Sequence, residues 1–250
     1  MRYAVQWFRS LIYVVQVYGM MLPIGVVFLP WALLDRRGAI AACKTWSRWA
    51  VWSARWMVGI RCEVRGTPPQ GEAMIAAKHQ SFLDIILIFK SIPAGKFIMK
   101  RELMYAPIIG QYALKLGCVP VDRGKRSQAI KKMVKDVERG RLAAGQLIIY
   151  PQGTRIAPGV RAPYKVGTAI LYQELGQPCV PVATNVGLFW PKKGIYRTPG
   201  TAVVEFLPPI QPGKPREIFL AELEEAVETA SDRLMAEAGF DAREAAERET

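Results

Sequence analysis

The hydrophobic positions follow two different patterns along the chain. The first part holds one long apolar run and a helix with tryptophans on one side, whereas from about residue 62 short apolar runs alternate with stretches of helical periodicity. This change predicts N-terminal membrane-associating helices over residues 1–61, an α/β domain over residues 62–214 and a charged amphipathic helix over residues 215–250.

Six short apolar runs have the length and composition of buried strands. They cover residues 73–78, 96–100, 117–121, 146–150, 179–184 and 201–206. Helical periodicity lies between several of them, over residues 81–90, 127–140 and 165–176. Such alternation predicts an α/β fold with a mostly parallel central sheet covered by helices, in which ligands bind at the carboxyl ends of the strands.

The apolar run near the N-terminus has the length of a membrane anchor. From Ser10 to Leu34 it holds 25 residues without a charge, and about 20 apolar residues cross a bilayer core. Pro23 and Pro30 lie within it, so a bent segment that dips into one leaflet fits as well as a spanning helix. A cleaved secretory signal fits less well, because the run is too long and charged residues follow it, so we expect a retained anchor.

Residues 44–56 form a second helical pattern, in which aromatic and basic side chains segregate. At about 100° per residue the four tryptophans fall within an arc of about 120°, with the basic residues beside them. They are Trp46, Trp49, Trp52 and Trp56, with Lys44, Arg48 and Arg55. The pattern is typical of a helix at a membrane interface. The alternative is a tryptophan-rich core helix.

The charge is unevenly distributed. The formal net charge is +13, and residues 221–250 hold ten acidic and three basic side chains, so the rest of the chain carries +20. Such a surface favours a polyanion: a nucleic acid, an anionic membrane face or a phosphorylated small molecule. The uncharged anchor and the lack of a recognisable nucleic-acid motif argue against the first. The acidic helix at the end is expected to be solvated or to fold back on the basic surface.

The cysteines and the single histidine do not form a metal pattern. Cys43, Cys62, Cys118 and Cys179 are widely spaced, with no C-x-x-C, and one histidine is too few for the usual zinc sites. We therefore expect reduced core thiols in a protein that faces the cytosol, and no metal.

The one histidine, His79, precedes Asp84 by five positions in "AAKHQSFLDI". On one continuous helix the two side chains would point about 140° apart, so they meet only across a bend. A strand that ends near Lys78 and a helix capped by Ser81 supply that bend. A carboxylate on one imidazole nitrogen leaves the other free to act as a general base. The alternative is that Asp84 only completes a capping box while His79 is an ordinary turn residue.

Basic residues recur where predicted strands end. They lie in "IMKREL" (98–103), "VPVDRGKR" (119–126) and "YPQGTR" (150–155). In a parallel sheet Lys100, Arg123 and Arg155 would share one edge with His79, where an arginine grips a phosphate through two hydrogen bonds. Each cation taken singly is also consistent with a solvated surface charge.

These motifs resemble the glycerolipid acyltransferase family, which includes the 1-acyl-glycerol-3-phosphate (lysophosphatidate) acyltransferases. Its H-x-x-x-x-D motif is met by His79 and Asp84, its second block by "GCVPVDR" with Arg123, its third by "YPQGTR", and its fourth by "CVPVAT" with Pro181. Two positions depart from the family pattern: Gln152 stands where glutamate is usual, and Lys78 where asparagine is common.

The resemblance implies that His79 and Asp84 are catalytic and that the substrates are a lysophospholipid and an acyl thioester of coenzyme A or of acyl carrier protein. His79 would deprotonate the free hydroxyl of lysophosphatidate, and the product would be phosphatidate. The substrate-binding residues implied are Lys100, Arg123, Gln152, Gly153, Thr154 and Arg155. No cofactor or metal is implied, and the expected location is the cytoplasmic face of a membrane, the bacterial inner membrane.

Two other functions fit the same residues. The chemistry could act on another lysolipid, such as a lyso-form of a phosphate-free aminolipid. A non-catalytic peripheral protein could instead bind anionic lipid through the cationic tryptophan helix.

Overall fold

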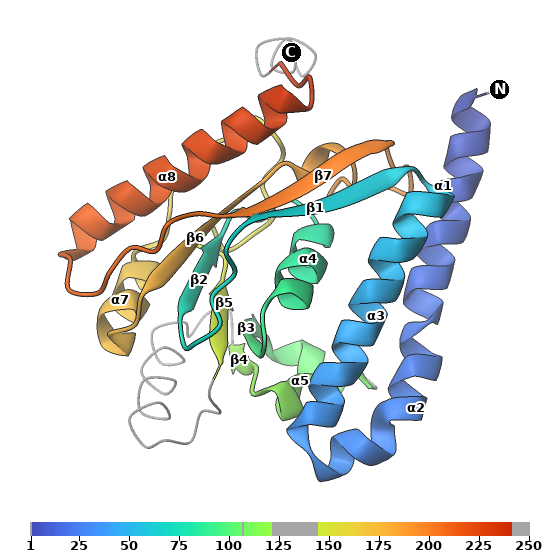
Figure 1. Cartoon of the computed structure of the whole chain (residues 1–250), viewed down its shortest axis with the longest axis horizontal. Coiled ribbons are helices and arrows are strands. Elements are labelled where there is room, and N and C mark those ends of the chain that lie inside the picture. The colour runs from blue at the N-terminus through green and yellow to red at the C-terminus, as the bar shows by residue number, and fades with distance from the viewer. Residues whose placement is uncertain (1, 107, 122–144, 242–250) are drawn as a thin grey trace.

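The computed structural model describes residues 2–106, 108–121 and 145–241. The predicted helix over residues 127–140, and Arg123, lie outside the described residues. The described residues form a central sheet with helices on both faces and a group of N-terminal helices at one side (Figure 1).

Seven strands form the sheet, in the order β1-β7-β6-β2-β5-β3-β4. They are β1 (Ile60–Gly66), β2 (Met74–Ala77), β3 (Gly95–Lys100), β4 (Val119–Val121), β5 (Gln146–Ile149), β6 (Cys179–Thr184) and β7 (Gly200–Phe206). All neighbours are parallel except β6 and β7. The predicted mostly parallel α/β sheet is therefore confirmed, and β1 is a strand that the hydrophobic pattern did not predict.

Helices cover both faces of the sheet, because the side chains of the central strands are apolar on both faces and must be buried on each. On β2, Ile75 and Ala77 face the cluster that contains α4 (Leu83–Ser91). Met74 and Ala76 face the cluster that contains α7 (Val166–Leu175) and α8 (Arg216–Glu237). The 3-10 helix η1 (Arg101–Tyr105) and α5 (Ile109–Leu116) follow β3, and η2 (Val186–Leu188) follows β6.

The last helix, α8 (Arg216–Glu237), packs on the sheet instead of lying in solvent. Phe219, Leu223 and Val227 have no exposed surface and join the core on the α7 side. Figure 1 shows α8 running across the strands on the face opposite to α4. Of the two expectations for this helix, solvated or folded back on the domain, the structure shows the second for this face, because its apolar stripe covers the sheet.

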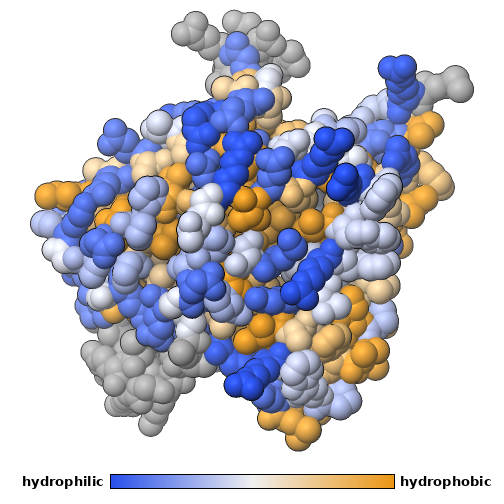
Figure 2. Space-filling model, in the orientation of Figure 1, coloured by the Kyte–Doolittle hydropathy of each residue, from blue (hydrophilic) through white to orange (hydrophobic). Residues whose placement is uncertain are grey.

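Three helices precede the sheet: α1 (Arg2–Gly19), α2 (Met21–Leu34) and α3 (Arg36–Met57). The stretch Arg2–Leu34 is long and apolar enough to cross a membrane, with 22% of its most apolar window buried. α1 buries one stripe against the core, made of Gln6, Ser10, Tyr13 and Val17. In Figure 2 hydrophobic residues follow the outer edge where Figure 1 places these helices.

The four tryptophans of α3 fall into two pairs. The indole N–H of Trp46 donates to the carbonyl of Val17 at 2.8 Å, and that of Trp49 to Gln16 at 2.6 Å. Trp52 and Trp56 are 57% and 65% exposed. The core-helix alternative is therefore wrong for the second pair, while the first pair ties α3 to α1.

The four cysteines form no disulfide. Cys118 and Cys179 are buried, and burial raises the pKa of the half-buried Cys43 and Cys62 thiols to about 12. Thiols with such pKa values stay protonated and unreactive near neutral pH.

Candidate active site

The turn that carries His79 connects β2 to α4 at the carboxyl edge of the parallel strands. The N–H of Lys78 still donates to Val182 on β6 at 2.9 Å, and α4 then begins at Leu83. The predicted cap is displaced by one residue, since Phe82 precedes the helix in helical conformation. The Ser81 hydroxyl nevertheless accepts the N–H of Leu83 at 3.1 Å.

Asp84 both orients the histidine and holds the turn. Its carboxylate lies 2.9 Å from Nδ1 of His79, and accepts the backbone N–H groups of Gln80 and Ser81 at 2.9 and 2.8 Å. Asp84 is fully buried, while 14% of the His79 side chain is exposed. Because the carboxylate accepts at Nδ1, the neutral ring carries its proton there and leaves Nε2 to accept another. The carboxylate therefore contacts the imidazole and holds the turn at the same time, while the role of His79 as a general base stays a prediction.

Tyr150, which follows β5, supports the imidazole from one side. Its ring stacks on that of His79 with centroids 4.0 Å apart. Burial, and then the nearby Asp84 charge, raise the pKa of Tyr150 well above its ordinary value. The hydroxyl makes no hydrogen bond of good geometry within the described residues. The stack restricts the plane of the imidazole ring.

The "YPQGTR" segment forms a tight turn beside the histidine. Gly153 has a φ of 72°, which favours glycine, and its N–H donates to the Tyr150 carbonyl at 2.8 Å. The N–H of Ile156 donates to the His79 carbonyl at 2.8 Å, so the two turns are joined directly. Gly153 and Thr154 are exposed. A Cβ at Gly153 would lie 2.6 Å from Nζ of Lys165, a cation that the motif reasoning missed.

The structure shows different things for the two predicted cations Arg155 and Lys100. Arg155 is half-buried and donates to the carbonyl of Lys192 at 3.2 Å, while the Lys192 ammonium donates to the Arg155 carbonyl at 2.9 Å. Lys100 is the last residue of β3, so its backbone reaches the same edge of the sheet. The phosphate-binding role of these residues stays a prediction.

Gln152 points inward, unlike its exposed neighbours. It is 4% exposed, and its Nε2 donates to Ala162 and to Oε1 of Glu228, both at 3.4 Å. Its Oε1 has no hydrogen-bond partner within the described residues. The geometry favours a structural role for Gln152 over the substrate contact that the motif predicts.

Lys78 and Glu228 form an ion pair that sequence reasoning missed. Each is 1% exposed, and the Lys78 ammonium donates to Oε2 of Glu228 on α8. The Tyr164 hydroxyl donates to Oε1 of the same carboxylate at 3.0 Å. One signal was present in the sequence, because Glu228 adjoins Val227 on the apolar face of α8.

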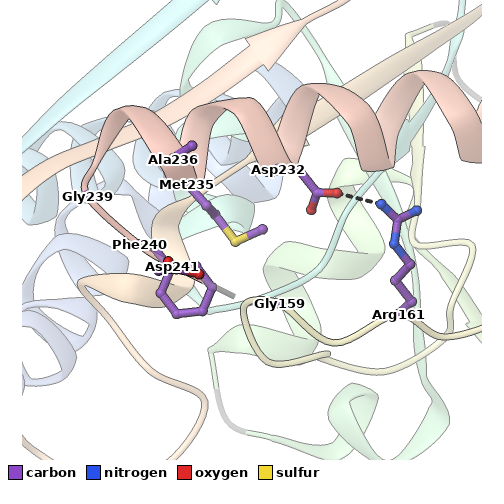
Figure 3. Close-up of a pocket in the computed structure, with 8 residues that line it drawn as sticks. All are labelled: Gly159, Arg161, Asp232, Met235, Ala236, Gly239, Phe240 and Asp241. Carbon is purple, nitrogen blue, oxygen red and sulfur yellow. Dashed lines mark hydrogen bonds and ion pairs between the residues drawn. The ribbon is translucent and has the colours of Figure 1, made fainter. Parts of the chain in front are cut away.

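An open cavity of about 540 Å³ lies between the end of α8 and the loop that follows the "YPQGTR" turn (Figure 3). Met235 and Phe240 contribute apolar surface, and Arg161 pairs with Asp232 at 2.5 Å on one side. Gln80 contacts Met235 at 3.6 Å, which places this cavity close to the turn. Within the described residues no cluster of histidine, cysteine or carboxylate side chains could hold a metal ion.

The acyltransferase family model matches residues 60–185. The chain belongs to the acyltransferase family. The match begins at β1 and ends one residue after β6, so it includes both turns described above.

Two relatives and one solved structure carry related names. The chain is 32% identical over 196 residues to the 1-acyl-sn-glycerol-3-phosphate acyltransferase of Pseudomonas aeruginosa, covering 78% of this chain and 76% of that enzyme. It is 29% identical over 163 residues to the mouse 1-acyl-sn-glycerol-3-phosphate acyltransferase alpha, covering 63% of this chain and 57% of that enzyme. The crystal structure of the 1-acyl-sn-glycerophosphate acyltransferase of Thermotoga maritima superposes with a TM-score of 0.79 at 21% identity, covering 94% and 100% of the two chains, and shows the same fold.

Proposed function

We propose that the chain transfers a fatty acyl group from an acyl thioester to the free hydroxyl of lysophosphatidate, giving phosphatidate. The observation that carries the proposal is the imidazole of His79, held by buried Asp84 at 2.9 Å and open to solvent over 14% of its side chain. The names of the bacterial and mouse relatives, both 1-acyl-sn-glycerol-3-phosphate acyltransferases, support the choice of acceptor.

The chemistry requires one base and no redox step. Nε2 of His79 takes the proton of the lipid hydroxyl as its oxygen attacks the thioester carbonyl. The new C–O bond forms, the C–S bond breaks, and the thiolate of coenzyme A or acyl carrier protein takes the proton back from the imidazolium. Asp84 stabilises that imidazolium while it exists.

The acceptor phosphate would bind beside the histidine. Gly153 and Thr154 are exposed there, and Arg155 is half-buried in the same turn. The hydrogen bond from Ile156 to the His79 carbonyl joins this turn to the segment that carries the base. We include Arg123 for its place in the second motif and Lys100, a weaker candidate, for its place at the end of β3.

The decisive experiment measures acyl transfer by purified protein in mixed micelles, with lysophosphatidate and either acyl-coenzyme A or acyl carrier protein thioester. His79→Ala should lower turnover by at least about 1,000-fold, because the base is lost. Lys193→Ala, which removes an exposed cation outside the turn, is the matched control and should retain activity. Turnover by His79→Ala equal to that of the wild type would end the proposal.

A panel of acceptors tests the phosphate site. Arg155→Ala should weaken use of lysophosphatidate and spare a phosphate-free lyso-aminolipid, since only the first carries the anion that arginine binds. Equal loss on both acceptors would argue against a phosphate contact. Vesicle binding without any thioester consumption by the wild type would favour the non-catalytic alternative.

We also propose that α1–α3 hold the protein at the cytoplasmic membrane face. The exposed rings of Trp52 and Trp56 support this placement. Trp52→Ala/Trp56→Ala should reduce co-sedimentation with anionic vesicles when the protein is added without detergent. Undiminished co-sedimentation would show that these two rings do not contribute to membrane binding.

A further inference from the structure

Lys78, the residue directly before His79, is a buried cation. It is 1% exposed, and its ammonium is paired with Glu228, which is also 1% exposed. Removing two charges from water is costly, and the cost is offset only when geometry and further hydrogen bonds satisfy both groups. Because this costly ion pair lies directly beside the proposed base, we expect it to have a function in the site.

The carboxylate of Glu228 joins three segments of the fold. Its Oε2 accepts from Lys78 after β2, and its Oε1 accepts from Tyr164 before α7 at 3.0 Å and from Gln152 after β5 at 3.4 Å. Glu228 itself comes from α8. The helix therefore contacts both turns of the site, the one that carries His79 and the one that carries residues 153–155.

We propose that Glu228 and Lys78 are positioning residues for acyl transfer, and that their buried ion pair fixes the His79 turn relative to the turn formed by residues 152–155. This inference rests on the proposed function. Neither side chain is exposed enough to meet a substrate. The pair acts by holding the base and the phosphate-binding turn at one separation.

The position of Gln152 makes the inference testable, because mutation can transfer the carboxylate from position 228 to position 152. Its Nε2 lies 3.4 Å from Oε1 of Glu228, so a glutamate at position 152 would place a carboxylate within the same cluster. In Glu228→Gln/Gln152→Glu the Lys78 ammonium regains an anionic partner from a different strand end. A merely structural helix contact of α8 would not be restored by this exchange.

The experiment measures kcat and both KM values for the wild type, Glu228→Gln, Glu228→Gln/Gln152→Glu and the control Glu225→Gln, which removes the same charge from the exposed side of α8. Glu228→Gln should lower kcat by about 100-fold, the scale expected when a base is displaced by about 1 Å. The KM values should stay within about twofold, the double variant should recover at least about tenfold in kcat, and the control should match the wild type.

Circular dichroism and the melting temperature give the folded fraction, by which each rate is divided. Unchanged kcat per folded molecule in Glu228→Gln, or no recovery in the double variant, would overturn the inference. Should Glu228→Gln fail to fold, Glu228→Asp keeps the charge but withdraws it by one methylene, and a kcat equal to that of the wild type would overturn the inference equally. A wild type without activity on any acceptor would instead defeat the proposed function.

Discussion

Asp84 and Glu228 hold two adjacent residues from opposite faces of the same sheet. Asp84, on α4, binds His79, while Glu228, on α8, binds Lys78. The alternation of β2 explains the division, because Ala77 faces the α4 side and Ala76 the α8 side. Continuing that alternation sends Lys78 toward α8 and His79 toward α4.

The two carboxylates differ in what they depend on. Asp84 is stabilised locally, by the backbone N–H groups of Gln80 and Ser81. Glu228 is stabilised by side chains from distant segments, Lys78, Gln152 and Tyr164. We therefore expect changes at Asp84 to affect chemistry more than stability, and changes around Glu228 to affect stability strongly.

The largest effect should follow Asp84→Asn. An amide oxygen at this position still accepts the two backbone N–H groups, but the amide NH2 then donates to Nδ1 of His79, favours the tautomer with its proton on Nε2 and no longer stabilises the imidazolium. We expect kcat to fall by about 1,000-fold to 10,000-fold with a melting temperature close to that of the wild type. A steady-state assay with parallel thermal melts checks this. A large loss of stability with little loss of kcat would contradict the expectation that Asp84 affects chemistry more than stability.

Lys78→Met should be the most destabilising single change around Glu228. It leaves the carboxylate buried without its cation, which costs about 3–5 kcal/mol of unfolding free energy. Lys78→Met/Glu228→Leu removes both charges and should recover part of that loss, because Tyr164 and Gln152 then lose the acceptor of their hydrogen bonds. Urea unfolding of the two variants measures the difference in unfolding free energy. Equal stability in both would show that the Lys78 and Glu228 charges are not energetically coupled.

Tyr164→Phe should have an intermediate effect. The hydrogen bond from Tyr164 to an ionised partner contributes about 1.5–3 kcal/mol. Burial, and then the Glu228 charge, raise the pKa of Tyr164. With the folded pKa above the unfolded value of about 10, the contribution is fully present below pH 10 and is lost as the pH rises further. Urea unfolding between pH 7 and pH 11 should therefore show the gap between variant and wild type closing above pH 10.

Tyr150→Phe should have the smallest effect. The stack on His79 is kept, and the hydroxyl that is removed has no hydrogen bond of good geometry within the described residues. We expect a change in unfolding free energy of no more than about 1 kcal/mol and a kcat within about threefold of the wild type. A tenfold loss of kcat would show that the hydroxyl acts on Asp84.

Much of the fold follows from local hydrophobic pattern. The six predicted strands are present because each is a short apolar run between turn residues, with ends that differ by a few residues. β1 was missed because "IRCEVRG" carries charged side chains at alternate positions and lies at the edge of the sheet, where only part of it is buried. Its pairing with β7 depends on residues far along the chain.

The site divides in the same way. The contact between His79 and Asp84 could be predicted because five residues and a cap define the bend. The inward orientation of Gln152 and the pairing of Lys78 could not, because both depend on where α8 crosses the sheet. Local spacing identifies side chains that share a turn, whereas packing of distant elements decides which of them reach solvent.

The edge position of β1 has a consequence for synthesis on the ribosome. The described sheet gives β1 a single neighbour, β7, with Ile60 opposite Gly200. The N-terminal helices and β1 therefore emerge from the ribosome long before β7, the strand with which β1 pairs. During translation the apolar helices are exposed while the sheet is unfinished, so the nascent chain can engage a bilayer before its catalytic half has folded.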